Sequence, residues 1–520
     1  MAKKVFTFII FFAFIAKVAA QIEVNSSNQV GIGTTNPQYK LHVVGDAFVT
    51  GNFLLGNASF LGTTGAYPVL FKSNNVQSGS TGSANNTDVY FGYETLLNPP
   101  SHPAFTGNTA VGYSALRGTY PNYSAQGLTG HNTAIGSYAL YSNEWGSYNT
   151  ANGSYALYSN TGGGNNTAIG YYALYANKSS NNTANGSYAL YSNTTGNNNT
   201  AVGYYALYSN TTGQRNVANG RDALYSNTTG AYNTAIGCGT LYTNSTGIYN
   251  SAIGANVLSN NTSGNYNTAI GNEALLYNTS GNFNTAIGYM AFRTNISGDY
   301  NIAIGRSYSN NTSGSYNTIV GCNAGPYSNN INNIINFSTT IGYGAQVTTS
   351  NQVRIGNASI TSIGGYAAWS NISDGRIKKN IRKDVPGLAF INDLQPITYN
   401  LDMDAIDELM KYEEPEVTDE GMEVPPPKSE KLIELERKAR EAKEQQVQTG
   451  FVAQDVEKAA KGVGYDFSGV DVDEMGIYSL RYAEFVVPLV KAVQELSQQN
   501  DRLQEQINEL NKRIEALERK

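Results

Sequence analysis

The stretch Asn199-Thr-Ala-Val-Gly-Tyr-Tyr-Ala-Leu-Tyr-Ser-Asn-Thr-Thr-Gly213 decides the fold of this 520-residue chain. Its opening motif, Asn-Thr-Ala-Ile-Gly with variants, begins at Asn108, Asn132, Asn149, Asn166, Asn182, Asn199, Asn216, Asn233, Asn250, Asn267, Asn284, Asn301 and Asn317. After a first interval of 24 residues, every later spacing is 16 or 17. Self-similarity at a fixed period predicts a solenoid in which each copy is one coil.

Each copy is too short for a pair of helices and contains two breakers of the Gly or Asn-Gly type. Short segments bounded by Gly, Asn and Ser are typical of strands and turns. We therefore expect a mainly β fold with two strands and two turns per copy, forming a parallel β-roll or β-helix. Ala and the β-branched Ile or Val should point inward, and Gly should take the corner because it alone accepts positive φ without steric cost.

Three copies carry Asn where Ile is expected, at Asn152, Asn185 and Asn219. Other copies separate them, so their amides cannot stack into one continuous ladder. The sequence alone assigns these three residues no firm role.

Tyrosine is abundant, with 38 residues, most of them in the Tyr-Ala-Leu-Tyr segment of the repeat. Flat rings that stack coil over coil, or that fill the space between subunits, are the favoured interpretation. The alternative is a face that binds a glycan or protein, because aromatic side chains among Asn and Ser suit such recognition.

Two cysteines, Cys238 and Cys322, lie five repeats apart. At about 4.8 Å per coil they are more than 20 Å apart, beyond the roughly 7 Å limit for a disulfide. We expect buried free thiols, so stability must come from packing.

The first 20 residues have the pattern of a secretory signal peptide. Lys3 and Lys4 precede an apolar run over 5–15, and small residues end at Ala20. The apolar run is too short to span a bilayer, which takes about 20 residues. The pattern predicts export to the bacterial envelope, either secreted or at the cell surface, with no transmembrane segment in the mature chain.

Charge is unevenly distributed along the chain, whose net charge is −6. Residues 21–370 carry 9 basic and 8 acidic side chains, whereas 371–520 carry 21 and 31. This break near residue 370 predicts a domain boundary. The acidic balance argues against nucleic acid as a partner, which needs clustered Lys and Arg. Three His and few Asp outside the C-terminal part give no support for a metal site, and no cofactor is expected.

The Asn-Thr-Ala-Ile-Gly copies resemble the β-roll heads of trimeric autotransporter adhesins, over roughly residues 108–356. The earlier stretch Val30-Gly-Ile-Gly-Thr-Thr-Asn-Pro-Gln-Tyr-Lys-Leu-His-Val43 is similar to segments of bacterial and phage fibre proteins. These resemblances imply an elongated homotrimer. The expected order is an N-terminal β-rich fibre segment over 21–107 and the solenoid over 108–369.

A second resemblance begins at Trp369-Ser-Asn-Ile-Ser-Asp-Gly-Arg-Ile-Lys-Lys-Asn-Ile381 and continues in Leu394-Gln-Pro-Ile-Thr-Tyr399, Gly450-Phe-Val-Ala-Gln-Asp-Val-Glu457 and 478–496. These segments resemble the endosialidase-type intramolecular chaperone domain of trimeric tail fibres, a self-cleaving mixed α/β module. The resemblance places this domain over 370–488.

In that family a Ser–Lys pair cuts the chain, and the matching residues are Ser373 and Lys378, with the target bond between Ile372 and Ser373. A serine hydroxyl needs a nearby base, and a lysine whose pKa is lowered by burial or by positive charge can serve. The alternative is an ordinary Ser-Asp-Gly-Arg turn followed by a solvated Lys pair.

The end of the chain predicts a coiled coil over 489–520. Spacings of four and three alternate through Leu489, Val493, Leu496, Asn500, Leu503, Ile507, Leu510, Ile514 and Leu517, and all of these residues except Asn500 are apolar. Asn500 falls at an a position, where a buried amide fixes register. Heptads alone do not give the number of helices in the coiled coil, and three helices are what the resemblances imply.

Residues 404–448 are predicted to be a charged insertion whose second part, from about Glu430 to Gln446, is helical.

Together these patterns predict an exported trimeric fibre or adhesin-like protein that assembles through its C-terminal domain and cuts itself once. A glycan or a cell-surface receptor is the expected ligand class. The alternatives are a purely structural filament, or a phage-derived tail fibre with a non-cleaving chaperone domain. A glycan hydrolase is disfavoured, because such enzymes need paired carboxylates and only eight acidic residues lie in 21–370.

Overall fold

The computed structural model describes residues 22–24, 30–32, 41–43, 70–73, 76–80, 88–95, 107–118, 130–307, 312–326, 334–360, 362–364, 372–410, 430–473 and 476–519. The chain divides into two compact units, Met1–Val69 and Leu70–Lys520. In the first unit, β2 (Val30–Ile32) pairs antiparallel with β1 (Ile22–Val24) and parallel with β3 (Leu41–Val43). The signal peptide predicted over 1–20 lies outside the described residues, as does much of 21–107.

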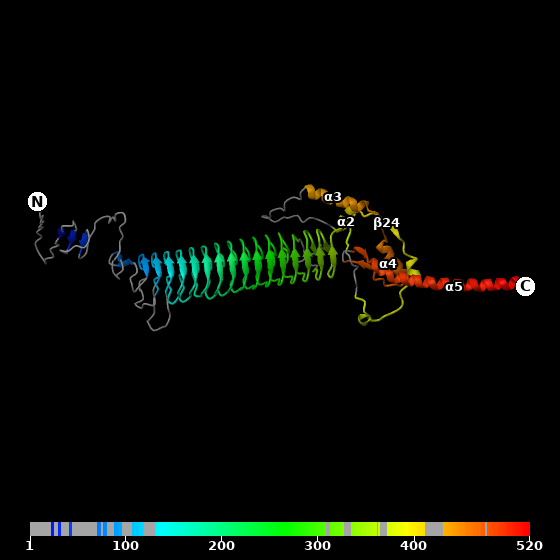
Figure 1. Cartoon of the computed structure of the whole chain (residues 1–520), viewed down its shortest axis with the longest axis horizontal. Helices are drawn as coiled ribbons and strands as arrows, with labels where there is room; N and C mark the ends of the chain where they lie inside the picture. Colours follow the sequence, from blue (N-terminus) through cyan, green and yellow to red (C-terminus); the bar gives the residue numbers. More distant parts are fainter. Residues whose placement is uncertain are drawn as a thin grey trace. The chain divides into compact units, whose positions relative to one another are not determined.

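The second unit is dominated by a parallel β-solenoid of about 14 turns (Figure 1). A hairpin of β4 (Leu70–Ser73) and β5 (Val76–Ser80) pairs antiparallel with its first strand. The stacked strands are β6 (Val89–Phe91), β7 (Thr109–Val111), β8 (Thr133–Ile135), β9 (Thr150–Asn152), β10 (Thr167–Ile169), β11 (Thr183–Asn185), β12 (Thr200–Val202), β13 (Val217–Asn219), β14 (Thr234–Ile236), β15 (Ser251–Ile253), β16 (Thr268–Ile270), β17 (Thr285–Ile287), β18 (Ile302–Ile304), β19 (Thr318–Val320), β21 (Thr339–Ile341) and β23 (Val353–Ile355). A second short pair, β20 (Gly325–Pro326) and β22 (Gln346–Val347), follows the same direction.

Register along this sheet is set by the repeat itself. In β12 and β13, Thr200 faces Val217, Ala201 faces Ala218 and Val202 faces Asn219. In every stacked strand except β23, the middle residue is buried and its two neighbours point outward, as strand geometry demands. Equivalent residues of successive copies therefore form continuous columns.

Two details of the predicted coil are wrong. The β-branched residue points outward, and Ile169, for example, is 39% exposed, because the narrow interior is filled by Ala and Leu columns. In the coils from β7 to β18 there is also one strand per coil and not two, since the Tyr-Ala-Leu segment is a turn. Among the described coils, only those of β19 and β21 add a second short strand, β20 and β22. Tyr205 and Leu207 adopt left-handed φ of 58° and 53°, so that their N–H groups donate to opposite neighbouring coils.

The expected role of the corner glycine is confirmed. Gly203 has φ of 132°, and a Cβ placed there would lie 2.5 Å from the carbonyl oxygen of Gly220 in the next coil. Glycine is therefore required both for its conformation and for the close approach of successive backbones.

Two ladders of buried asparagine run along the solenoid. In the first, each motif-opening Asn accepts from the next one, as where the Asn233 N–H donates to Asn216 Oδ1 at 3.0 Å. In the second, Asn227 Nδ2 donates to Asn210 Oδ1 at 2.7 Å and to the Gly230 carbonyl at 3.0 Å. Such linked amides satisfy the polar groups of each turn without water.

The C-terminal region is a small mixed α/β arrangement. Its elements are η1 (Gly375–Ile377), α1 (Leu388–Ile391), β24 (Ile397–Tyr399), α2 (Met403–Met410), α3 (Glu430–Gln445), β25 (Gln448–Gly450), α4 (Ala453–Gly462), β26 (Val470–Val472), β27 (Tyr478–Leu480), η2 (Tyr482–Phe485) and α5 (Val486–Glu518). Strands β24 and β25 pair antiparallel, as do β26 and β27. Phe390, Val456, Phe467 and Phe485 form its core. The helix predicted from Glu430 is confirmed as α3.

Cys238 and Cys322 are free, as expected, but both are exposed and not buried. Each follows the corner glycine, where the chain has left the interior. Among the described helices, none is long and apolar enough to cross a bilayer.

Candidate functional site

The structure brings Ser373 and Lys378 together. Asp374 caps the short helical turn η1, since its Oδ1 accepts from the Arg376 N–H at 2.8 Å. The turn folds the chain back, so that Lys378 Nζ donates to Ser373 Oγ at 2.8 Å. A nucleophile and a candidate base therefore touch across one turn of backbone.

Charge around this pair is partly neutralised. Arg376 forms a salt bridge of 2.6 Å with Asp374, and this hydrogen bonding lowers the pKa of the Asp374 carboxyl. The same contact raises the pKa of the Arg376 guanidinium. Arg376 is consequently engaged with a carboxylate, which leaves Lys379 as the adjacent cation beside Lys378.

The bond predicted to be cut, between Ile372 and Ser373, is exposed to solvent. Ile372 is 86% exposed, and Ser373 and Lys378 are also exposed. A lysine that acts as a general base must be neutral, which burial promotes by penalising the charged ammonium. Among the described residues, Ser373 and Lys378 are thus in contact, and none of these residues buries the pair.

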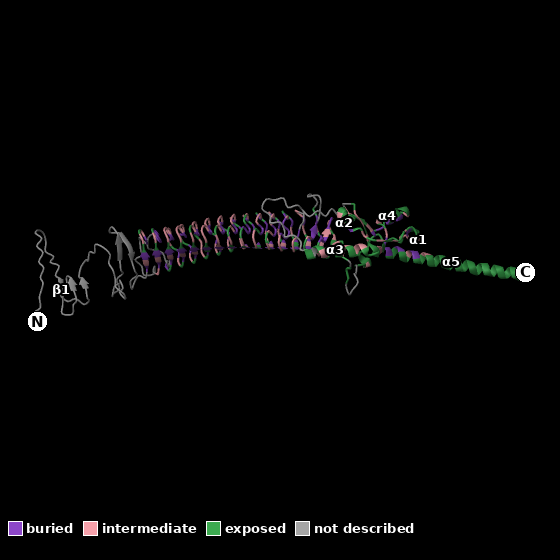
Figure 2. Cartoon of the chain, turned by 90° about the horizontal axis from the view of Figure 1, so that it is seen from above, coloured by how far each residue is buried: buried purple, intermediate pink, exposed green. Residues whose placement is uncertain are grey.

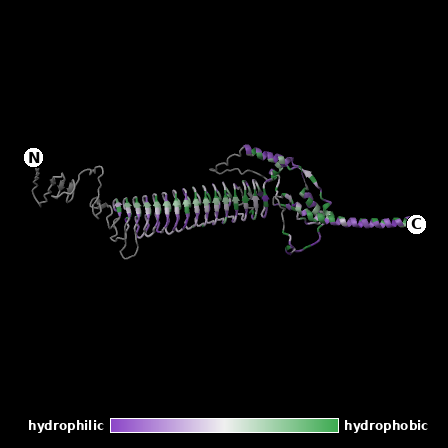
Figure 3. Cartoon of the chain, in the orientation of Figure 1, coloured by the Kyte–Doolittle hydropathy of each residue, from purple (hydrophilic) through white to green (hydrophobic). Residues whose placement is uncertain are grey.

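Helix α5 carries an apolar stripe that no other described part of the chain covers. The predicted a and d side chains are 46 to 71% exposed, at Leu489, Val493, Leu496, Leu503, Ile507, Leu510, Ile514 and Leu517. Figure 2 shows the long outer part of α5 as exposed, and Figure 3 shows that hydrophobic and hydrophilic residues alternate along it. Asn500 lies on the same helix and is exposed.

Aromatic rings form ladders along the solenoid, and this supports the packing interpretation. Tyr208 and Tyr225 stack with centroids 5.2 Å apart and planes 9° apart, and Tyr266 and Phe283 with 4.8 Å and 2°. Because each ring face lies against the next ring, the solvent meets ring edges and hydroxyls. The face-on stacking that sugars use is available only at a ladder's ends.

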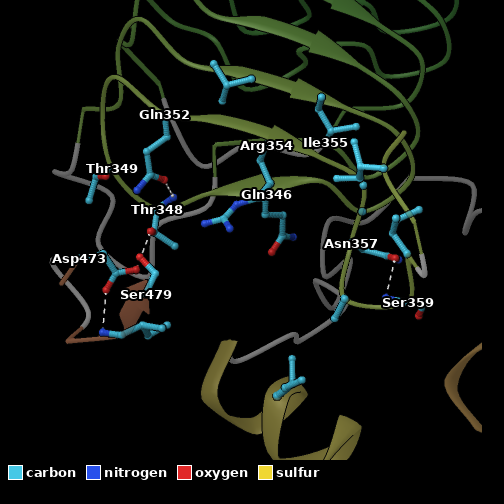
Figure 4. A pocket seen from close by; sticks show the side chains of 18 of the residues that line it. Gln346, Thr348, Thr349, Gln352, Arg354, Ile355, Asn357, Ser359, Asp473 and Ser479 are labelled. Atoms are coloured by element: carbon cyan, nitrogen blue, oxygen red, sulfur yellow. Dashed lines mark hydrogen bonds between the residues drawn. The ribbon is translucent and has the colours of Figure 1, made fainter. Parts of the chain in front are cut away.

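A groove of about 1500 Å³ lies in the second unit and was not predicted (Figure 4). Its lining includes Gln346, Arg354 and Asn357 from the last coils and Ser479 from β27. Thr348 Oγ1 donates to Asp473 Oδ2 at 2.8 Å across 125 residues of sequence. Local motifs give no signal for such a groove, because its walls come from distant segments.

Comparisons with known proteins add no family. No family model, no curated protein and no solved structure matches this chain. What the geometry defines is a repetitive parallel β-solenoid followed by a mixed α/β region and a long helix.

Proposed function

We propose that this protein is an exported fibre or adhesin-like surface protein that assembles from three copies through its C-terminal region. The observation that carries the proposal is the apolar stripe of α5. Eight a and d side chains are left at least 46% exposed in the single chain. Heptads of this kind are stable when helices pack a and d knobs into facing holes, so parallel copies of α5 are the natural cover.

Assembly through α5 would help the solenoid to fold. Stacked coils fold by pairing segments from successive copies, and open sheet edges invite wrong partners while folding is incomplete. Copies held together at their C-terminal ends start folding in alignment, which lowers the entropy lost on association.

Self-cleavage before Ser373 is the second part of the proposal, supported by the 2.8 Å contact with Lys378. The neutral Lys378 amine takes the hydroxyl proton as Ser373 Oγ attacks the Ile372 carbonyl carbon. The C–N bond to Ser373 breaks, an ester forms, and the released amine gains the proton; water then hydrolyses the ester. Nucleophile and target belong to one chain, so effective concentration is high and one turnover suffices.

The test of cleavage is a denaturing gel of the full-length protein beside its Ser373→Ala variant. The native chain should give two fragments that meet between residues 372 and 373, and the variant one uncut band. Ser362→Ala, at another exposed serine upstream, is the matched control and should still be cut. Continued cleavage of Ser373→Ala would remove the Ser–Lys assignment.

Assembly is tested separately by sedimentation. Replacing Leu503 and Ile507 by Glu should convert the trimer to monomer, whereas Glu at the polar positions Gln504 and Asn508 should not. A monomeric native protein would contradict the proposal.

A glycan or cell-surface receptor is the partner proposed for the adhesin form. The solenoid's ladders present rows of tyrosine side chains whose ring centroids lie near 5 Å apart, as between Tyr208 and Tyr225 at 5.2 Å. A binding screen with the purified assembly distinguishes an adhesin from a filament that has no receptor.

A further inference from the structure

The outward third residue of each strand follows a pattern along the solenoid. From β8 to β14 it alternates strictly between apolar and amide, through Ile135, Asn152, Ile169, Asn185, Val202, Asn219 and Ile236. From β14 to β18 it is uniformly apolar, through Ile236, Ile253, Ile270, Ile287 and Ile304. The three Asn residues are therefore members of a regular row, which we call the outer row.

The backbone conformation of the corner glycines alternates in the same way. The corner glycines after the amide residues, Gly153, Gly186 and Gly220, have φ of 147 to 149°. Those after the apolar residues have φ of 130 to 132°, at Gly136, Gly170, Gly203 and Gly237. Two coils, and not one, are thus the structural unit in this half of the solenoid.

The outer row forms an exposed face on one side of the sheet. Its Ile side chains are 38 to 42% exposed, as at Ile236 and Ile253. Asn152, Asn185 and Asn219 are exposed too, and within the described residues their side chains make no hydrogen bond. The single chain therefore leaves apolar area of this row exposed and its amide groups without hydrogen bonds to protein, so that another surface could cover the area and bind the amides.

The size of this face suits a stable interface. Sixteen stacked strands, from β6 to β19 with β21 and β23, span about 70 Å at roughly 4.8 Å per strand. With a width of about 10 Å the face offers about 700 Å², close to the roughly 800 Å² that each partner buries in an ordinary stable complex.

We propose that the outer row is where copies of this chain meet, and that its alternation of amide and apolar residues fixes their axial register. The inference rests on the proposed multi-copy assembly and names a surface within it. A second copy of the chain is the occupant, because only an identical, parallel, in-register chain offers an amide opposite each amide and Ile opposite each Ile. The self-complementary pattern is what selects this partner.

Register follows from the cost of mismatch. A slip by one coil sets Asn152, Asn185 and Asn219 against apolar side chains, which leaves buried amides unpaired. A slip by two coils restores two of the amide pairs but sets Asn219 against Ile253, in the uniform part of the row. The aligned state alone pairs all three amides, as a buried Asn does in a coiled coil.

Disulfide trapping in the full-length chain tests both parts. With Cys238→Ser and Cys322→Ser as background, Ile270→Cys reports aligned copies. A mixture of differently tagged Ile253→Cys and Ile270→Cys chains reports a one-coil slip, since these residues are neighbours in the sheet. In aligned copies the Ile270→Cys thiols face each other directly, whereas Ile253→Cys is displaced from them by about 4.8 Å along the stack. We therefore expect about ten-fold more matched than mixed disulfide.

The register device is then removed by Asn152→Ile, Asn185→Ile and Asn219→Ile together, and the mixed disulfide should rise several-fold. The matched control adds three Ile residues elsewhere, by Thr195→Ile, Thr212→Ile and Thr229→Ile in exposed turns outside the strand face, and should leave the ratio unchanged.

Each outcome has a distinct meaning. A multimer by sedimentation that forms no Ile270→Cys disulfide would show that copies meet on another face, and the inference would fall while the proposed assembly stands. A mixed disulfide as abundant as the matched one before the Asn substitutions would overturn the register claim. A native chain that sediments as a monomer would remove both.

Discussion

Asn216 and Asn199, 17 residues apart, are joined by a hydrogen bond of 3.0 Å from the Asn216 backbone N–H to Asn199 Oδ1. Both residues are buried, and Asn216 Nδ2 also donates to the Gly230 carbonyl at 2.8 Å. One side chain thus satisfies groups in two coils, which makes the asparagine columns part of the solenoid's framework.

Loss of such an amide should destabilise the solenoid. Asn216→Ala leaves the Asn233 N–H without its buried acceptor and removes one of the two donors to the Gly230 carbonyl, which Asn227 Nδ2 still contacts, at a cost of about 1 to 3 kcal/mol. The change is measured from the urea midpoint. Thr212→Ala, at an exposed turn residue of the preceding coil, should cost less than about 0.5 kcal/mol. Equal midpoints for the two variants would contradict the framework role.

The interior should reject even two added methyl groups. Ala252 is fully buried, so Ala252→Val overpacks the coil and should cost about 1 to 3 kcal/mol. Ala255 lies on the same coil and is partly exposed, so Ala255→Val is the matched control with a small effect. Thermal unfolding of both variants distinguishes a narrow interior from a loosely packed one.

The corner glycine should be the least replaceable residue type. Gly203→Ala forces a positive φ on alanine and brings Cβ to 2.5 Å from the Gly220 carbonyl oxygen, so a loss of more than about 3 kcal/mol is expected. At Gly162 an added Cβ meets nothing within 4 Å, and Gly162→Ala should be tolerated. Similar yields of folded protein from the two variants would be the contrary result.

Ionisation of Tyr172 should require a high pH. The hydrogen bond between the Tyr172 and Tyr171 hydroxyls, in which Tyr172 donates, together with desolvation, raises the pKa of Tyr172 to about 12. A raised pKa favours the neutral phenol in the folded state, so this stabilisation is complete below pH 10 and is lost as pH rises from 10 towards 12. Absorbance at alkaline pH follows the titration. Tyr171→Phe should shift part of it to lower pH, whereas Tyr148→Phe, outside this pair, should leave that late step unchanged.

Lys378 should be indispensable for the proposed cut. Lys378→Gln removes the base that contacts Ser373 Oγ at 2.8 Å, so the chain should stay full-length. Lys379→Gln alters the neighbouring cation only and should slow the cut without abolishing it. Mass spectrometry of the two termini decides, and efficient cleavage of Lys378→Gln at the same bond would rule out a lysine base.

Much of the solenoid could be predicted from its period. A repeat of 17 residues with Gly and Asn breakers leaves little besides a parallel stack of β coils, and the structure confirms that class. Which way Ile points could not be predicted, because Thr-Ala-Ile fits either face of a strand. The direction of the Ile side chain depends on how much room the interior of the coil has. Leu207 and its equivalents, which point inward from the turn, fill that interior and leave no room for Ile.

The second predicted strand was wrong for a related reason. Tyr-Ala-Leu-Tyr has the composition of a strand, yet alternate residues such as Tyr205 and Leu207 take left-handed φ. Hydrogen bonds to the coils on either side stabilise that conformation, and they exist only when the stack is complete. A signal for the asparagine columns was present, since the motif-opening Asn never varies from Asn108 to Asn317.

The two residues of the candidate site could be predicted from the sequence, but the charged groups around them could not. Spacing and resemblance identified Ser373 and Lys378, and the structure shows how a single turn capped by Asp374 joins them. The salt bridge between Asp374 and Arg376 could not be predicted from spacing alone, because it depends on how the turn orients the two side chains.

The paired coils have a consequence for how this molecule can change length. Deleting or duplicating two adjacent coils, such as those that begin at Asn166 and Asn182, adds or removes 33 residues and keeps every amide in phase. A change of one coil would put the remainder out of phase. Variants of this gene product that differ in reach should therefore differ by even numbers of coils in the half before Ile236, and by any number after it.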